Sequence, residues 1–338
     1  MAINANAFSP KQFKFLVAEQ DDFGTHAADE SSPNNDFLAL DVDSVGTPSF
    51  NVNQVIEPRT GSRILQATDF FQDKIAKVIE ISVSGTANTE TLDLLLSHIT
   101  GDTSVPFSVA SNIAAQTFTT ATANDTNQGM LSIVYASPLA DTDLSFRDCF
   151  CTSLSLNGDM GTEGGRIKYS ATFKTGSLPT DLSDGTTSVD TAITAADYFM
   201  SGWDADDRIV AGIANCLVNS FTLNIENDAI FSGPTSTGYE SVARVGEVSA
   251  TADFNIKYDT NTEALIANYH DQAGGVTEGA TLMATDATPS DGEFEFKMAS
   301  SIITNVGYAE GDIMGLDVSV KAVGAGVGSS TVLFEVAC

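Results

Sequence analysis

Residues 78–100, VIEISVSGTANTETLDLLLSHIT, decide how this sequence is interpreted. In the first part apolar and polar residues alternate, which is typical of a half-buried antiparallel strand, and the apolar positions are Ile79, Ile81 and Val83. In the second part the apolar residues lie on one face of a helix, at Leu92, Leu95, Leu96 and Ile99. Asn88 suits the N-cap, Glu90 lies in the first turn, and Gly101 follows as a stop. The sequence therefore predicts a strand followed by a capped helix.

A similar arrangement occurs at residues 248–270, VSATADFNIKYDTNTEALIANYH. Asn88 and Asn261 differ by 173 positions, and this offset matches the apolar positions of one strand with those of the other. SFNVN at 49–53 matches SFTLN at 220–224 with an offset of 171, and residues 167–174 match 314–321 with an offset of 147. The order is preserved, which favours an internal duplication. The alternative is that strands of one composition resemble each other by chance.

The expected fold is mainly β, with two tandem β-sandwich or β-barrel modules, each with a flanking α-helix. The first module is expected at residues 1–180 and includes an irregular acidic insert near its start, at 18–36. The second module is expected at residues 181–338. The stretch TGSLPTDLSDGTTSVDT, residues 175–191, has the composition of a linker or loop between them.

The charge balance restricts the possible partners. Among 338 residues, 45 acidic side chains stand against 15 basic ones, which gives a formal net charge of −30. Such a surface repels nucleic acid and anionic lipid, so neither is expected as a specifically bound partner. No apolar run reaches the length of a membrane span, and no secretory signal is visible, so we expect synthesis in the cytoplasm and no membrane association.

No catalytic motif is visible, so we expect neither enzymatic activity nor a cofactor. His26, His98 and His270 do not neighbour a nucleophile, and the glycine-rich residues 324–330 lie between expected strands, which favours a hairpin turn over a nucleotide site. The four cysteines are expected to be reduced thiols in or near the core: Cys149, Cys151, Cys216 and Cys338.

Acidic side chains leave two alternatives open. Acidic clusters begin at Asp41, Asp204 and Asn124, but no glutamate completes a calcium loop, which favours solvated loops. A pair of carboxylates for sugar hydrolysis is set by the fold and not by spacing, so a hydrolase on a β-sandwich stays open. The single tryptophan, Trp203, and sparse tyrosines do not favour a sugar-binding surface.

Several stretches resemble the tail tube (major tail) proteins of long, non-contractile-tailed bacteriophages. They are residues 78–102, VIEISVSGTANTETLDLLLSHITGD; 150–176, FCTSLSLNGDMGTEGGRIKYSATFKTG; 215–229, NCLVNSFTLNIENDA; and 246–269, GEVSATADFNIKYDTNTEALIANY. The acidic insert and residues 111–129 have no counterpart in the family. The resemblance implies a virion protein whose rings stack into a tube that conducts DNA from the capsid into the cell.

The resemblance also implies partners. Hairpins of neighbouring subunits join into a continuous β-barrel, other tail proteins bind the tube ends, and the tape-measure protein and DNA pass through the lumen without specific binding. Tails are commonly sixfold, so a chain with two modules predicts a ring of three subunits with pseudo-sixfold symmetry. An alternative is a secreted or surface β-sandwich adhesion protein of a salt-adapted microbe, in which the acidity reflects the habitat.

Two alternating stretches are the candidate lumen hairpins, with their polar faces toward a negatively lined channel. Their residues are Ile167, Lys168, Tyr169, Ser170, Ala171, Thr172, Phe173 and Lys174, and Met314, Gly315, Leu316, Asp317, Val318, Ser319, Val320 and Lys321. Because Lys168, Lys174 and Lys321 do not suit an acidic lining, we expect them to pair with carboxylates of neighbouring subunits.

Overall fold

The computed structural model describes most of the predicted strands and both predicted helices. The described residues are 13–20, 23–24, 37–45, 54–56, 64, 66, 70–72, 78–100, 116–118, 129–136, 143–161, 166–182, 208–235, 238–244, 248–271, 277–278, 281–284, 294–298, 300–311, 313–323 and 334–337. Predictions for the stretch 49–53, for the acidic clusters that begin at Asp204 and Asn124, for the turn at 324–330, and for His26, Trp203 and Cys338 lie outside them.

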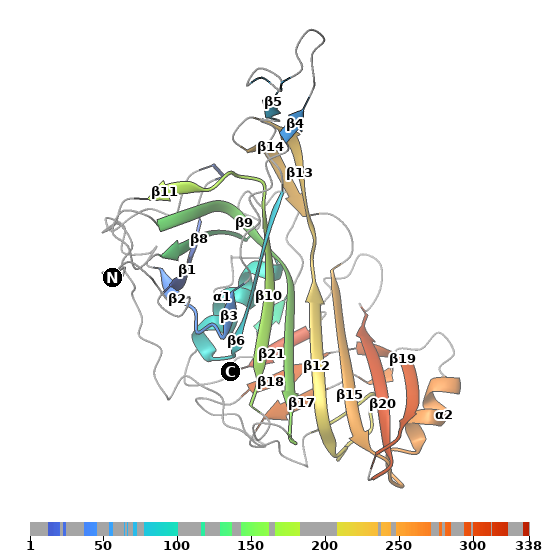
Figure 1. The fold of residues 1–338 in the computed structure, drawn as a ribbon. Helices are drawn as coiled ribbons and strands as arrows, with labels where there is room; N and C mark the ends of the chain where they lie inside the picture. Colours follow the sequence, from blue (N-terminus) through green and yellow to red (C-terminus); the bar gives the residue numbers. More distant parts are fainter. Residues whose placement is uncertain are drawn as a thin grey trace.

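One large antiparallel sheet dominates the molecule (Figure 1). Its main row contains nine strands, and strands from both halves of the chain lie side by side in it. In spatial order these are β16 (Thr277–Glu278), β19 (Ser300–Ala309), β20 (Gly315–Ala322), β15 (Ser249–Lys257), β12 (Val218–Glu226), β9 (Asp143–Asp159), β10 (Lys168–Thr175), β6 (Ile79–Thr86) and β3 (Ser44–Val45).

A side branch extends the sheet from the first part of β9. β9 is long enough to pair with β8 and β11 near its start and with β12 near its end. β8 continues the branch to β1, which pairs in turn with β2. The strands of this branch are β1 (Lys14–Glu19), β2 (Leu38–Ala39), β8 (Met130–Ala136) and β11 (Thr180–Leu182).

The remaining described strands form smaller units. Two hairpins extend from one end of the molecule, and a four-stranded sheet lies behind the large one (Figure 1). The hairpins are β4 (Gln54–Ile56) with β5 (Phe70–Gln72), and β13 (Ala229–Pro234) with β14 (Tyr239–Arg244). The four-stranded sheet contains β17 (Thr281–Ala284), β18 (Phe294–Lys297), β21 (Phe334–Ala337) and β7 (Gln116–Phe118).

Both predicted helices are present, and they are capped in different ways. α1 (Thr89–Thr100) follows Asn88, whose side-chain Oδ1 accepts a hydrogen bond from the Thr91 amide at 2.8 Å. α2 (Ala264–Asp271) is capped differently, because Asp259 Oδ1 accepts from the amides of Asn261 and Thr262, at 2.9 and 3.1 Å. Asn261 is therefore not an N-cap. Asp259, two residues earlier, is the capping residue, and residues 260–263 form turns.

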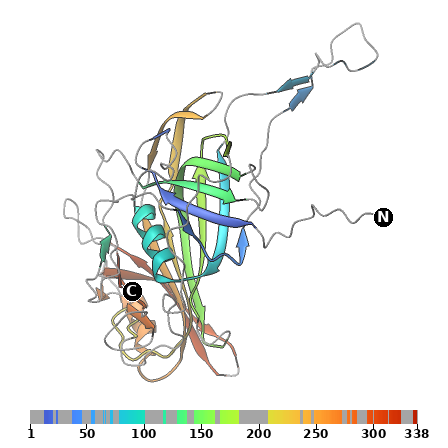
Figure 2. The same ribbon diagram turned by 90° about the vertical axis from the view of Figure 1, so that its left-hand side faces the viewer.

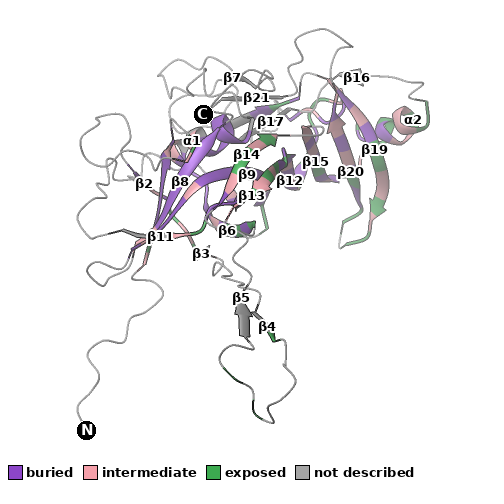
Figure 3. Ribbon diagram, turned by 90° about the horizontal axis from the view of Figure 1, so that it is seen from above, coloured by how far each residue is buried: buried purple, intermediate pink, exposed green. Residues whose placement is uncertain are grey.

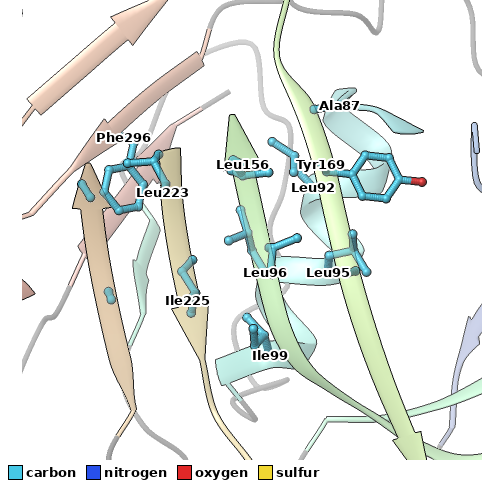
Figure 4. Packing of buried hydrophobic residues seen from close by; sticks show 14 of the residues in the cluster. Ala87, Leu92, Leu95, Leu96, Ile99, Leu156, Tyr169, Leu223, Ile225 and Phe296 are labelled. Atoms are coloured by element: carbon cyan, nitrogen blue, oxygen red, sulfur yellow. The ribbon is translucent and has the colours of Figure 1, made fainter. Parts of the chain in front are cut away.

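The hydrophobic core lies between the apolar face of the large sheet and α1 (Figures 2 and 4). The four apolar side chains predicted for one face of α1 are fully buried, and each contributes about 1.5–3 kcal/mol through burial: Leu92, Leu95, Leu96 and Ile99. Seen from above, purple buried segments run through β8, β9, β12 and β15, while green exposed segments occur on the β13–β14 hairpin, on β19 and on α2 (Figure 3).

The mainly β prediction is confirmed, with a large antiparallel sheet, smaller sheets and two short helices among the described residues. The described strands do not divide into a separate sandwich for each half of the chain. β12 pairs with β9 from Ser220 opposite Asp159 to Glu226 opposite Ser153, and this pairing makes one continuous sheet.

Candidate functional site

Alternate residues of six neighbouring strands form one extended surface, here called the polar face. All of its residues are exposed or half-buried, while the residues between them are buried in the core. The polar face comprises Glu80, Ser82 and Ser84 of β6; Lys168, Ser170, Thr172 and Lys174 of β10; Ser153, Ser155, Asn157 and Asp159 of β9; Ser220, Thr222, Asn224 and Glu226 of β12; Ser249, Thr251, Asp253, Asn255 and Lys257 of β15; and Asp317, Ser319 and Lys321 of β20.

The strand register aligns these side chains into rows across the sheet. Because directly opposed residues of antiparallel strands point to the same side, each row extends over several strands. One row crosses six strands and contains, in order, Ser84, Ser170, Ser155, Asn224, Thr251 and Lys321. The polar face is therefore a continuous wall built by both halves of the chain.

The structure brings the two candidate hairpin stretches into this wall. Lys168–Thr175 is β10 and Gly315–Ala322 is β20, and β15, β12 and β9 lie between them. Their apolar members are buried on the opposite face: Tyr169, Ala171, Phe173, Leu316, Val318 and Val320. Ile167 is buried just before β10, whereas Met314 is 49% exposed just before β20. The sequence interpretation missed the contribution of the other four strands, although their alternation was visible.

Two of the four lysines of the polar face pair with carboxylates of the same chain. Lys168 Nζ lies 3.1 Å from Asp43 Oδ2, and Lys174 Nζ lies 2.8 Å from Asp228 Oδ1 and 3.8 Å from Glu80 Oε1. The hydrogen bond from Lys174 is the largest of the effects that lower the pKa of Asp228. Lys168 and Lys174 thus have carboxylate partners within the chain, and partners on neighbouring subunits stay a prediction.

The described polar face is close to neutral. It carries five carboxylates and four lysines, and the other side chains are hydroxyls and amides. Some of the polar groups bond across strands, since Asn219 Nδ2 donates to Asn255 Oδ1 at 3.0 Å and Asn255 Nδ2 donates to Asp317 Oδ1 at 2.7 Å. These six strands are therefore not strongly negative on their polar side, and the negatively lined channel stays a prediction.

Two β-bulges occupy corresponding places in the two halves of the sheet. Between β9 and β10 the register shifts at Thr152, and between β19 and β20 it shifts at Thr304. The Thr152 hydroxyl donates to the Thr172 carbonyl at 3.2 Å, and the Thr304 hydroxyl donates to the Ser319 carbonyl at 3.1 Å. Thr172 and Ser319 are 147 positions apart, which is the offset predicted from the sequence for these strands.

A second correspondence links β3 with β12. Val45 of β3 pairs with Val83 of β6, and Val218 of β12 pairs with Ile256 of β15. Val218 follows Val45 by 173 positions, and Ile256 follows Val83 by the same number. The register between β10 and β6 differs by two residues from the register between β20 and β15. Thr172 of β10 faces Ser82, whereas Ser319 of β20 faces Asp253. A shift of two residues leaves every side chain on its own face.

Arg244 anchors the base of the β13–β14 hairpin to the end of α1. Its buried guanidinium donates to the carbonyls of His98 at 2.6 Å, Asn227 at 2.8 Å and Cys151 at 3.0 Å. Asn227 Nδ2 also donates to the Ile99 carbonyl at 2.7 Å. Side chains of the second half of the chain therefore satisfy carbonyls at the C-terminus of a helix in the first half.

The described histidines and cysteines are buried, with the exception of His270. His98 is buried and its Nδ1 lies 2.7 Å from the Leu94 carbonyl, while His270 is exposed at the end of α2. Cys149, Cys151 and Cys216 are buried free thiols, and burial is the main cause that raises the pKa of each. Within the described ranges, no three His, Cys, Asp or Glu side chains group into a metal site.

No protein-family model matches this chain, and no curated protein matches it either. Among the described helices, neither has the length and apolar character required to cross a membrane.

Proposed function

We propose that this protein is the structural subunit of a bacteriophage tail tube, and that three copies form each ring of a hollow conduit for DNA. In this proposal each chain contributes two tandem copies of one β-module, so that a ring of three chains has pseudo-sixfold symmetry. The observation that carries the proposal is the order of strands in the large sheet.

The strand order supports two copies. The row β9-β10-β6-β3 belongs to the first half and the row β19-β20-β15-β12 to the second, and corresponding strands follow one another in the same spatial sequence. Each half also has a hairpin before its β6-like strand and a helix after it. Two further observations support this correspondence of strands. The bulges at Thr152 and Thr304 lie at equivalent positions, and the pair Val45–Val83 has a counterpart 173 positions later in the chain.

The junction between the copies supports a ring. β12, the last strand of the second row, pairs with β9, the first strand of the first row, so the copies meet head to tail. A head-to-tail contact that is repeated between chains generates a closed ring when the rotation closes. Closure also removes the free sheet edges, which are otherwise an aggregation hazard.

The difference between the two faces of the sheet supports a ring in which the polar face lines the lumen. α1 and the core lie on the apolar side, so closure with that bulk outside directs the polar face toward the lumen. Hydroxyls and amides predominate there, and Lys168 and Lys174 already have carboxylate partners. Such a wall offers few free cations to phosphates, and DNA passes without specific binding.

Electron microscopy of the purified chain tests this function. Rings or stacked tubes with three chains per ring, counted in a reconstruction and by native mass spectrometry, are the expected result. Rings of six chains would contradict the two-copy symmetry while leaving the tube function. A chain that stays monomeric at every concentration and ionic strength tested would contradict the tube function and favour a β-sandwich adhesion protein.

A further inference from the structure

We infer that the outer edge of β19, together with the open side of α2, is the docking surface for the β3 edge of a second copy of this chain. This inference rests on the proposed ring function, because it assigns the strands through which the rings close. It treats the junction between β12 and β9 within the chain as the pattern for the contact between chains.

The edge of β19 is occupied at one end and open at the other. In β9, the edge opposite β10 is shared: β8 pairs near Cys149, and β12 pairs from Ser153 onward. In β19, β16 pairs at Ser300 and Ser301, which correspond to residues 148 and 149 through the offset between the bulges. Among the described residues, no strand pairs with that edge of β19 beyond Ser301. The missing neighbour corresponds to β12.

Side-chain burial shows the same difference. Leu156 of β9 lies opposite Leu223 of β12 and is 1% exposed. Its counterpart in β19, displaced by the same 152 positions as Thr304 from Thr152, is Tyr308, which is 59% exposed. The Tyr308 ring contacts Tyr258 edge to face, with centroids 5.6 Å apart. β20 lies on its inner side, and among the described residues no strand covers it on the outer side. An aromatic side chain at an open sheet edge is suited to burial against another chain.

The helices differ in the same way. α1 is covered at its C-terminus by Arg244 and Asn227 from the base of the β13–β14 hairpin, and its last turns are buried. α2 stands beside β19 at the margin of the molecule, and Ala267 and His270 are exposed (Figure 1). In the described part of α2 only the Leu265 side chain is buried. The side of α2 that corresponds to the covered side of α1 thus lacks a hairpin from a following module.

The other end of the sheet supplies the matching surface. β3 is the outermost strand there, and within the described residues it pairs only with β6. β3 corresponds to β12 through the shared displacement of its pairing, and β12 is the strand that fills the edge of β9. A second copy that offers β3 to β19 therefore repeats a contact that the chain already makes with itself. The occupant is this chain, through the opposite edge of its sheet.

The test uses the full chain with Tyr308→Asp, which places an uncompensated charge at the docking edge. The expected result is a folded protein, with the unfolding midpoint of the wild type, that forms no rings at concentrations where the wild type is fully assembled. Tyr308→Phe retains an aromatic side chain at this position, and this variant is expected to assemble. Leu178→Asp introduces the same charge at another exposed apolar position, 42% exposed and away from both edges, and is also expected to assemble.

Mixing variant and wild-type chains distinguishes an interface between β19 and β3 from an interface between two copies of β19. A tagged Tyr308→Asp chain keeps its β3 edge, so it is expected to retain untagged wild-type chains on an affinity column and to prevent ring closure. Exclusion of the variant from all wild-type complexes would overturn the inference, because it would indicate that β19 pairs with β19. Normal rings from Tyr308→Asp would also overturn it, while leaving the tube function. Absence of rings from the wild type would instead contradict the proposed function.

Discussion

Thr152 and Thr304 make the same contact in the two halves of the large sheet. Each is the extra residue of a bulge, and each hydroxyl donates to a carbonyl of the facing strand, that of Thr172 at 3.2 Å and that of Ser319 at 3.1 Å. A bulge bends its strand and increases the local twist. Two bulges at corresponding positions therefore give the two hairpins the same bend, as a sheet that closes on itself requires.

Replacing each hydroxyl with a methyl group tests the bulges. We expect Thr152→Val to lower the free energy of unfolding by about 1 kcal/mol, because a largely buried hydrogen bond is lost. Thr304→Val is expected to have a smaller effect, because Thr304 is exposed and water replaces the hydroxyl. Urea denaturation measures both. Thr222→Val, at a half-buried position of the polar face, is the control, and an equal effect of Thr152→Val and Thr222→Val would contradict the role of the bulge hydroxyl.

Much of the strand pattern and all of α1 are predictable from local sequence. Period-two alternation identifies β6, β10, β15 and β20, and the spacing of Leu92 to Ile99 identifies α1. These signals work because burial of one face acts on every second residue of a strand and on every third or fourth residue of a helix. The offset of 147 also relates Thr172 to Ser319, which the bulges later match.

The remaining features depend on contacts that local sequence does not encode. A bulge inserts one residue and leaves no composition signal, so the positions of Thr152 and Thr304 were not predictable. α2 is capped by Asp259 because its carboxylate reaches two amides, although the Asn-Thr-Glu motif at 261–263 matches the one whose asparagine caps α1. The pairing of β12 with β9 joins residues that lie far apart in the chain, and only the fold sets it.

Arg244 is expected to hold α1 and the β13–β14 hairpin together. Arg244→Met removes the donor to three carbonyls, including that of His98, and leaves them buried without it. We expect a loss of about 3 kcal/mol in the free energy of unfolding, with a smaller loss for Arg244→Lys, which keeps the charge but not the planar fork. Thermal and urea unfolding measure the change. Lys257→Met, at an exposed position, is the control, and unfolding of Arg244→Met at the wild-type midpoint would contradict the anchor.

His98 is expected to make stability fall at mildly acidic pH. Burial is the main cause that lowers its pKa from 6.5 to about 4, and the charge of Arg244 acts in the same direction, while the hydrogen bond with Leu94 opposes them. Between these values the unfolded chain binds a proton that the folded chain does not, so the free energy of unfolding decreases as pH falls from 6.5 toward 4. The decrease reaches at most about 3 kcal/mol.

Comparison of pH profiles isolates this contribution from that of the carboxylates. His98→Gln cannot bind the proton, so its free energy of unfolding is expected to fall less steeply than that of the wild type between pH 7 and pH 4.5, whatever its stability at pH 7. His270→Gln, at an exposed position, should follow the wild-type profile. Parallel profiles for the wild type and His98→Gln would show that the imidazole is not held neutral.

The neutral character of the polar face leads to a test of the conduit itself. Ser155 lies at the middle of the wall, opposite Ser170 on one side and Asn224 on the other, so a lysine placed there meets no carboxylate in its row. Ser155→Lys is therefore expected to assemble and to bind duplex DNA with an affinity that falls as salt rises, whereas the wild type does not bind. Leu178→Lys adds the same charge outside the polar face. If both variants retain DNA equally in gel-shift and anisotropy measurements on assembled particles, the added charge acts from any surface and Ser155 does not line the path of the DNA.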